Sequence, residues 1–256
     1  MGRTKPSKSG LFEILFQIGR IGQMIGETLY YILSGRVNLK ETFKQMTALG
    51  VESIPIVFVI SGFTGMVFSL QVSQEFARFG AAALIGQILG IAIVRELAPV
   101  LTGVVVAGRA GAAIAAELGT MKVTEQVDAL RALGTSPVQY LVAPRFLACV
   151  IMVPILTVFA NLVGMLGGYF IAVYQVGVIS EVFYEMTVLY LTFYDVAVSL
   201  MKALVFGIII VTVSCDRGLR TERGAQGVGD SAISAVVGSM IAVFIANYFL
   251  SAFFFH

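Results

Sequence analysis

Residues 95–137 read RELAPVLTGVVVAGRAGAAIAAELGTMKVTEQVDALRALGTSP. This stretch opens with an adjacent arginine and glutamate and a proline inside an apolar run, continues as a track of Gly and Ala, and ends in a charged segment. Ionisable groups at membrane depth are costly, so they are usually buried in protein or face a cavity, and they indicate function. The charged segment directly after them suggests that this stretch connects a component outside the membrane to the part of the protein within it.

The composition of the 256-residue chain is that of a membrane protein. Hydrophobic residues make up 58% of it and charged residues only 12%, whereas a soluble domain carries about twice that charged fraction. Apolar runs at 54–75, 82–108, 146–174, 196–214 and 231–253 approach or exceed the roughly 20 residues that a membrane-spanning helix needs. We therefore expect an all-α integral membrane protein with five transmembrane helices.

The first 53 residues are interpreted as a cytoplasmic N-terminal region, and residues 54–256 as the five-helix domain. Residues 11–33 carry four polar side chains on one stripe of a helix whose other face is apolar: Glu13, Gln17, Arg20 and Glu27. Because a spanning helix would not expose charges to lipid on one face, this pattern predicts an amphipathic helix in the cytoplasmic interface. Residues 36–53 read as a polar connection, and no cleavable signal peptide is expected.

Lysine and arginine are distributed unevenly along this layout. All of them precede the first run or follow the second and fourth runs, except Arg78, Arg95 and Lys202, while the loop between the third and fourth runs is acidic and ends at Asp195. The positive-inside rule therefore predicts five crossings with the N-terminus in the cytoplasm and the C-terminus outside. An odd number of crossings without an internal repeat argues against two inverted halves, so the chain is expected to need a second copy of itself.

Small residues gather at 62–65, 103–112 and 164–168. They allow helices to approach closely. The approach can join helices of one subunit or helices of two subunits, and the sequence leaves both open.

The common catalytic and metal-binding motifs are missing from the chain. It has no G-x-x-x-x-G-K-[ST] loop, no G-x-S-x-G elbow and no H-E-x-x-H. The only histidine is His256, and Cys149 and Cys215 lie in apolar helices, where cysteine behaves as a small buried hydrophobe. We expect no catalytic residue, no metal site and no cofactor in this chain, and no nucleic-acid partner.

We single out a set of charged and polar side chains within the apolar runs: Arg95, Glu96, Lys202 and Asn247. Arg95 and Glu96 are adjacent and do not face one another on a helix, and Pro99 weakens the turn that contains them. Each must find a partner elsewhere, and Lys202 and Asn247 are the candidates. The group is either a polar centre that moves or gates, or a structural ion pair that holds helices together.

Aromatic and amide side chains lie at the outer end of the first run. Phe68, Gln71, Phe76 and Phe79 could line a cavity for an amphipathic ligand, and we name them as candidate substrate-binding residues. An ordinary interfacial belt of aromatic residues is the alternative explanation.

Residues 112–145 form a candidate coupling segment on the cytoplasmic side. Its polar candidates for contact with a partner are Glu117, Glu125, Gln126, Asp128 and Arg131. Residues 125–133 have good helical propensity and stop at a glycine and a proline. A short helix between two spans suits docking into a groove of another protein, and a solvated loop is the alternative.

At these residues the chain resembles the MlaE family of ABC-transporter permeases, which act in bacterial and plastid lipid transport. The resemblance rests on RELAPVLTGVVVAGRAGAAIAAELGTMKVTEQVDAL, SPVQYLVAPRFLA and GAQGVGDSAISAVV and runs from about residue 40 to the end. It implies a homodimer of five-span subunits, each with an N-terminal interfacial helix. It also implies two copies of a cytoplasmic ATPase, which bind Mg-ATP, and a ring of MCE-domain proteins beyond the membrane.

The resemblance also implies roles for single residues. Residues 117–133 correspond to the coupling helix that contacts the ATPase. Glu96 and Lys202 match charged positions typical of the family, whereas Asn247 stands where relatives often have Asp.

These expectations combine into a non-enzymatic permease subunit that moves phospholipids or related lipids between the inner membrane and a periplasmic MCE-domain partner. Its membrane would be the bacterial inner membrane or the plastid inner envelope. An integral-membrane enzyme that acts on lipids with Glu96 as acid or base is one alternative. A self-contained ion-coupled transporter is the other.

Overall fold

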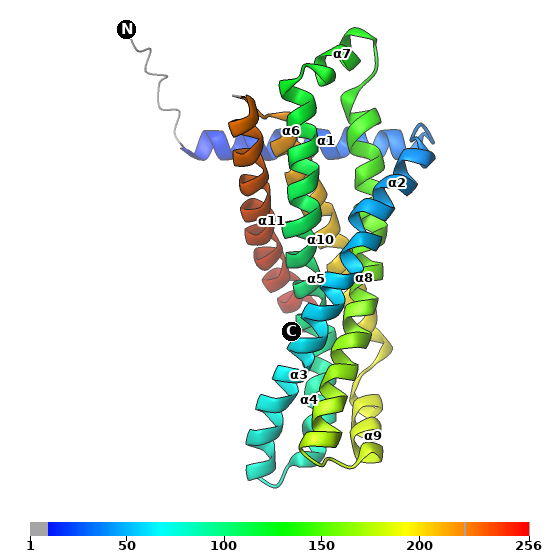
Figure 1. Cartoon of the computed structure of the whole chain (residues 1–256), viewed down its shortest axis with the longest axis vertical. Helices are drawn as coiled ribbons and strands as arrows, with labels where there is room; N and C mark the ends of the chain where they lie inside the picture. Colours follow the sequence, from blue (N-terminus) through cyan, green and yellow to red (C-terminus); the bar gives the residue numbers. More distant parts are fainter. Residues whose placement is uncertain (1–9, 223, 256) are drawn as a thin grey trace.

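The computed structural model describes residues 10–222 and 224–255, and within them it contains helices and no strand. Five of these helices are long and apolar enough to cross a membrane: Leu39–Phe76, Ile85–Val123, Val138–Gln175, Phe193–Leu219 and Gly224–Phe255. They run side by side as one elongated bundle (Figure 1). The all-α membrane fold with five spans is confirmed.

The spans are assembled from shorter segments, several of which are joined by single π-helical turns. The N-terminal part comprises α1 (Gly10–Leu33), α2 (Leu39–Leu49), η1 (Val51–Ser53) and α3 (Ile54–Arg78). After η2 (Ala82–Leu84), the second span comprises α4 (Ile85–Ala92), η3 (Ile93–Leu97), α5 (Ala98–Val106), η4 (Ala107–Gly111) and α6 (Ala112–Val123). The remainder comprises α7 (Gln126–Ala132), η5 (Val138–Val142), α8 (Ala143–Phe170), η6 (Ile171–Gln175), α9 (Ser180–Tyr190), α10 (Phe193–Leu219) and α11 (Gly224–Phe255).

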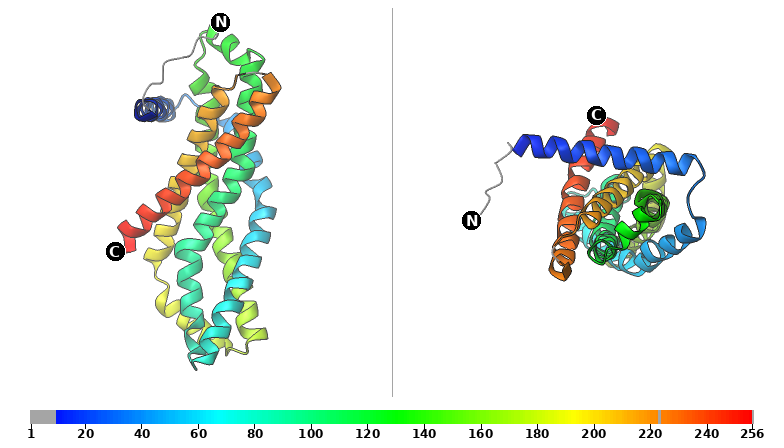
Figure 2. Two further views of the ribbon diagram at one scale, coloured as in Figure 1. Left: turned by 90° about the vertical axis from the view of Figure 1, so that its left-hand side faces the viewer. Right: turned by 90° about the horizontal axis from the view of Figure 1, so that it is seen from above.

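Helix α1 lies across the bundle at one end, roughly perpendicular to the spans (Figures 1 and 2). Arg20 anchors it to α10, because its Nε and Nη2 lie 3.0 and 3.2 Å from the two carboxylate oxygens of Asp216. The interpretation of residues 36–53 as a polar connection is wrong. Asn38 caps α2 through the Glu41 amide, and α2 continues through η1 into the first span.

The second span is longer than the sequence predicts. The helix continues past residue 108 to Val123, and 39 residues at about 1.5 Å each extend well beyond a bilayer core of about 30 Å. Arg109, expected in a loop, lies in this helix and donates from Nη1 to the Ala48 carbonyl over 2.8 Å and pairs with Glu52 at 2.7 Å. The span is therefore tied to the start of the first span.

The fourth span begins earlier than predicted. Thr192 and Asp195 form a capping box that starts α10 at Phe193, so Asp195 lies in the helix and not in an outer loop. A separate helix, α9, precedes it and packs against α4. Helix α11 ends partway along the bundle, whereas α3, α4 and α9 occupy its far end (Figures 1 and 2). The start of α10 and the C-terminal end of α11 thus meet the second span partway along the bundle.

Glycines set the closest helix contact, between α3 and α8. A Cβ added at Gly65 would collide with the carbonyl of Gly164, and one added at Gly167 would collide with that of Gly62. Ser69 donates to the Gly168 carbonyl over 2.8 Å in the same seam. These small residues are used within one subunit, where they allow two backbones to touch.

Candidate functional site

The adjacent charges Arg95 and Glu96 lie in the π-helical turn η3. Single π-turns inside α-helices are frequent at functional sites. Pro99 lies two residues after this turn and has no N–H, so it cannot donate the helical hydrogen bond to the Arg95 carbonyl. Lys202 of α10 donates to that carbonyl over 2.8 Å instead. The proline therefore exposes a backbone acceptor that a charged side chain from another span takes up.

Glu96 is the centre of a network that joins three spans. Its Oε1 lies 2.8 Å from the Lys202 ammonium and accepts a hydrogen bond from Ser251 over 2.8 Å. Its Oε2 accepts from the Asn247 amide over 2.8 Å. Lys202 also donates to Ser251 over 2.8 Å. Both residues named as candidate partners from the sequence thus contact Glu96.

Arg95 pairs with a different residue, Asp195. Its Nε lies 2.7 Å from Oδ1 of Asp195, whose side chain is 1% exposed. The other oxygen of Asp195 accepts from the Thr192 amide and hydroxyl, each over 2.8 Å. The guanidinium carbon of Arg95 lies 4.4 Å from the centre of the Phe255 ring, a geometry suited to a cation–π contact. The first turn of α10 and the end of α11 thus meet at Arg95.

A cavity of about 390 Å³ opens beside this network. Its walls combine the charged pair of η3 with apolar and hydroxyl side chains of α4 and α11: Ile91, Ala92, Arg95, Glu96, Tyr248, Ser251, Ala252 and Phe255. The Lys202 side chain is fully buried, whereas 40% of the Glu96 side chain is exposed. The carboxylate therefore borders the cavity while its cationic partner is sealed behind it.

The four candidate substrate-binding residues do not form one site. Phe68 and Gln71 line a second cavity of about 360 Å³ together with Phe63 and Leu97, and Leu97 belongs to the same turn as Glu96. Phe76 packs against the core. The Phe79 side chain is 81% exposed and lies past the end of α3. Phe68 and Gln71 are therefore placed near the charged network, and the other two are not.

The predicted coupling segment contains a short helix, α7, at the end of the bundle where α1 lies (Figure 1). Glu125 turns the chain between α6 and α7 with a φ of 61°, a left-handed conformation that a residue with a side chain rarely adopts. Gln126 opens the helix and donates to Thr124 over 3.0 Å. The turn holds α7 at an angle to the long second span.

Ion pairs fix α7 and its base. Asp128 lies 2.7 Å from Lys122 of α6 and 3.3 Å from Arg131. The hydrogen bond from Lys122 holds the pKa of Asp128 below its usual value, so Asp128 is ionised at neutral pH. Glu117 pairs with Arg145 of α8 at 2.9 Å. Asp128, Arg131 and Glu117 are all exposed, and Glu117 joins α6 to α8 below the helix.

Sequence reasoning missed four residues of these networks: Asp195, Ser251, Phe255 and Asp216. Two of them left a readable signal. The pattern Thr192-x-x-Asp195 is that of a capping box, and Ser251 lies four residues after Asn247, hence on the same helix face. Asp216 and Phe255 had no such signal, because their partners come from distant parts of the chain. No three His, Cys, Asp or Glu side chains come together as a metal site among residues 10–222 and 224–255.

Comparison with known proteins gives consistent matches over nearly the whole chain. The family model Permease MlaE matches residues 42–253. A probable ABC transporter permease protein of Synechocystis is 48% identical over 89% of this chain and 87% of its own length. A probable ABC transporter permease protein of Rickettsia typhi is 41% identical over 94% and 90%. The Arabidopsis chloroplast protein TRIGALACTOSYLDIACYLGLYCEROL 1 is 41% identical over 90% of this chain and 66% of its own length.

Proposed function

Because the chain belongs to the MlaE family of ABC transporter permeases, we propose that it moves phospholipids or related lipids between the inner membrane and a periplasmic MCE-domain partner. In this proposal two copies of the chain work with two copies of a cytoplasmic ATPase that binds Mg-ATP. The N-terminus lies in the cytoplasm, α1 lies in the cytoplasmic interface and the C-terminus lies outside. The membrane is the bacterial inner membrane or the plastid inner envelope.

The observation that carries the proposal is the continuity of the second span. One helix, Ile85–Val123, holds Arg95 and Glu96 near one end and continues to the turn that bears α7 at the other. A rigid helix transmits a displacement along its axis, whereas a chain of flexible loops would absorb it. Movement of an ATPase bound at α7 would therefore reach the charged network and the cavity beside it.

The cavity fits a lipid better than a small polar solute. Its charged wall offers a carboxylate and a guanidinium, which suit a headgroup, while Tyr248 and Phe255 border the same space. Exposed apolar side chains of α3 and α11, among them Phe63 and Phe244, can accompany acyl chains. The Arabidopsis relative carries the name of a galactolipid, which agrees with a lipid substrate.

The two alternatives from the sequence receive less support. An acid or base for lipid chemistry needs a proton-transfer position open to the substrate, but both oxygens of Glu96 already accept hydrogen bonds from protein donors. An ion-coupled transporter needs no partner at α7, and this helix and its exposed charges would then have no role.

Purification in mild detergent, with mass spectrometry of the proteins and lipids that accompany the chain, tests the proposal. The expected companions are an ABC ATPase, an MCE-domain protein and phospholipid. The variant Asp128→Asn should lose the ATPase and keep the lipid. The control Glu75→Gln/Arg78→Gln, an exposed pair on α3, should keep both. Lipid turnover by the chain alone, without ATP, would contradict the proposal.

A further inference from the structure

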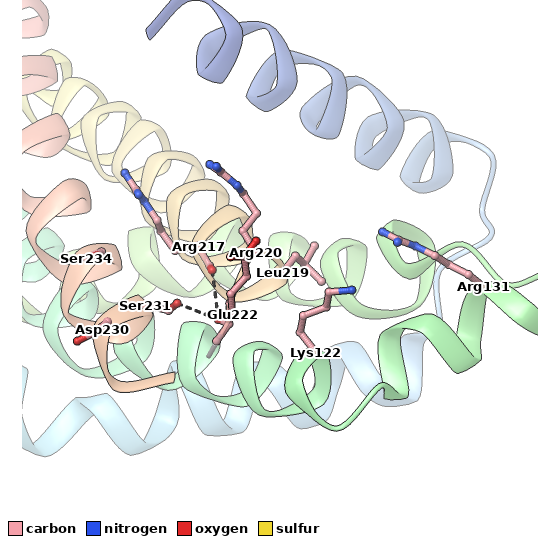
Figure 3. Close-up of a pocket in the computed structure, with 10 residues that line it drawn as sticks. Lys122, Arg131, Arg217, Leu219, Arg220, Glu222, Asp230, Ser231 and Ser234 are labelled. Atoms are coloured by element: carbon pink, nitrogen blue, oxygen red, sulfur yellow. Dashed lines mark hydrogen bonds between the residues drawn. The ribbon is translucent and has the colours of Figure 1, made fainter. Parts of the chain in front are cut away.

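A third cavity, distinct from those at Glu96 and at Phe68, lies beside α7. It has a volume of about 500 Å³ and lies between the ends of α6, α7 and α10 and the start of α11. Four basic side chains from three helices line it: Lys122, Arg131, Arg217 and Arg220. In Figure 3, Arg217 and Arg220 extend from α10 toward the side on which α1 runs, and Lys122 and Arg131 lie across from them.

Positive charge exceeds negative charge in this pocket. Glu222 and Asp230 are its only acidic lining residues among those the structure describes. Lys122 and Arg131 share Asp128, and Arg220 lies 3.6 Å from Asp216. Arg217 differs from them, since no side-chain hydrogen bond or ion pair is recorded for it within residues 10–222 and 224–255.

The side-chain environment favours a compact anion. Arg217 is half-buried and lines the pocket together with three further basic side chains. Ser231 and Ser234 of α11 supply hydroxyl groups on another wall. A guanidinium with neighbouring hydroxyls suits the oxygens of a phosphate group, and a pocket of this volume suits a small group better than a flat protein surface.

We infer that this pocket binds the phosphate-bearing headgroup of an anionic phospholipid in the cytoplasmic leaflet. Basic pockets between spans on the cytoplasmic side bind such headgroups, and the pocket lies at the end of the bundle where α1 crosses (Figures 1 and 3). The bound lipid is a resident one that is not transported. It bridges α10 and the base of α7, two parts that must keep their relative positions if α7 transmits movement of the ATPase. The inference rests only on the proposed orientation.

Native mass spectrometry of the full-length chain tests the inference. Delipidated protein is titrated with dioleoyl phosphatidylglycerol or dioleoyl phosphatidylcholine. Wild type should bind one phosphatidylglycerol per chain in preference to phosphatidylcholine. Arg217→Gln should weaken phosphatidylglycerol binding about fivefold, and Arg217→Gln/Arg220→Gln about 25-fold, since each basic residue contributes about one such factor. Arg217→Gln leaves no recorded partner unpaired, so it should fold even if the double variant does not.

The control variant removes as many positive charges as the double variant does, on the same side of the membrane but outside the pocket. Arg36 precedes α2 and Lys40 lies in its first turn, and both are exposed. Arg36→Gln/Lys40→Gln should bind phosphatidylglycerol as wild type does. Unchanged binding by Arg217→Gln and the double variant overturns the inference. So does equal competition by millimolar inorganic phosphate, which would make this a site for soluble phosphate. Lost ATPase association with intact lipid binding would also overturn it in favour of an acidic protein surface. The readout needs neither ATP nor transport, so it stands if the proposed transport fails.

Discussion

The ion pair Glu96–Lys202 allows a prediction in which stability and transport separate. Glu96→Gln keeps the shape of the side chain but leaves the fully buried Lys202 ammonium without a counter-charge. Hydrogen bonding can be restored, because Oδ1 of Asn247 has no partner among residues 10–222 and 224–255, and a flipped amide would accept from the new Gln. The loss is therefore mainly one of charge, and we expect about 3 kcal/mol, the lower end for a broken buried pair.

The reverse change should cost less. Lys202→Met removes the buried ammonium and fills its volume, while Glu96 faces the cavity, where water can solvate it, so we expect about 1 kcal/mol or less. The double variant should be no less stable than Lys202→Met, which makes the changes non-additive by about 3 kcal/mol or more. For a chain of this length Glu96→Gln should lower Tm by about 6–12 °C. Phospholipid transfer should be lost in all three variants.

Thermal unfolding in detergent and lipid transfer in proteoliposomes measure the two effects. The exposed pair Glu75–Arg78 serves as the control, and its cycle should show coupling of about 0.5 kcal/mol or less. Additive stabilities at Glu96 and Lys202, within about 0.5 kcal/mol, would refute the energetic reasoning. Wild-type transport by the stable double variant would show that the network only holds the bundle together.

Three further predictions concern other parts of the molecule. Gly65→Ala should destabilise the fold by about 1–3 kcal/mol through overpacking, measured as a lower Tm. Gly62→Ala should cost less, because its added Cβ would meet a side chain at 3.3 Å and not a backbone. Equal costs for the two variants would contradict the packing described for α3 and α8. Arg20→Gln should release α1 from Asp216 and speed proteolysis of α1, and unchanged proteolysis would show that the ion pair does not hold the helix. Asp128→Asn should reduce ATPase stimulation by the chain with the bundle still folded, as judged by an unchanged Tm, and full stimulation would exclude Asp128 from coupling.

Much of the fold could be predicted because hydrophobic length and periodicity are local properties. The five spans and the helix α7, between Glu125 and Gly134, follow from apolar runs, propensity and stop signals. Predicted boundaries were wrong where polarity and helix formation diverge. Residues 39–49 are polar yet helical because Asn38 caps them, and the second span continues to Val123 because its Gly and Ala pack closely while remaining helical.

The charged network could be predicted only in part. Intramembrane charge identified Arg95, Glu96, Lys202 and Asn247, because such groups need partners. The partner of Arg95 was not foreseen, since Asp195 lies beside the apolar run and was placed in a loop. Its position depends on where α10 begins and on where α11 ends, and the meeting of distant chain ends is a tertiary property.

ATP-dependent transfer of fluorescent phospholipid tests the central claim most directly. Proteoliposomes that contain the chain are assayed with and without the cytoplasmic ATPase and the MCE-domain partner. The account predicts transfer only with both partners and ATP, and its loss in Glu96→Gln. Transfer by the chain alone, whether without ATP or driven by a proton gradient, would contradict it.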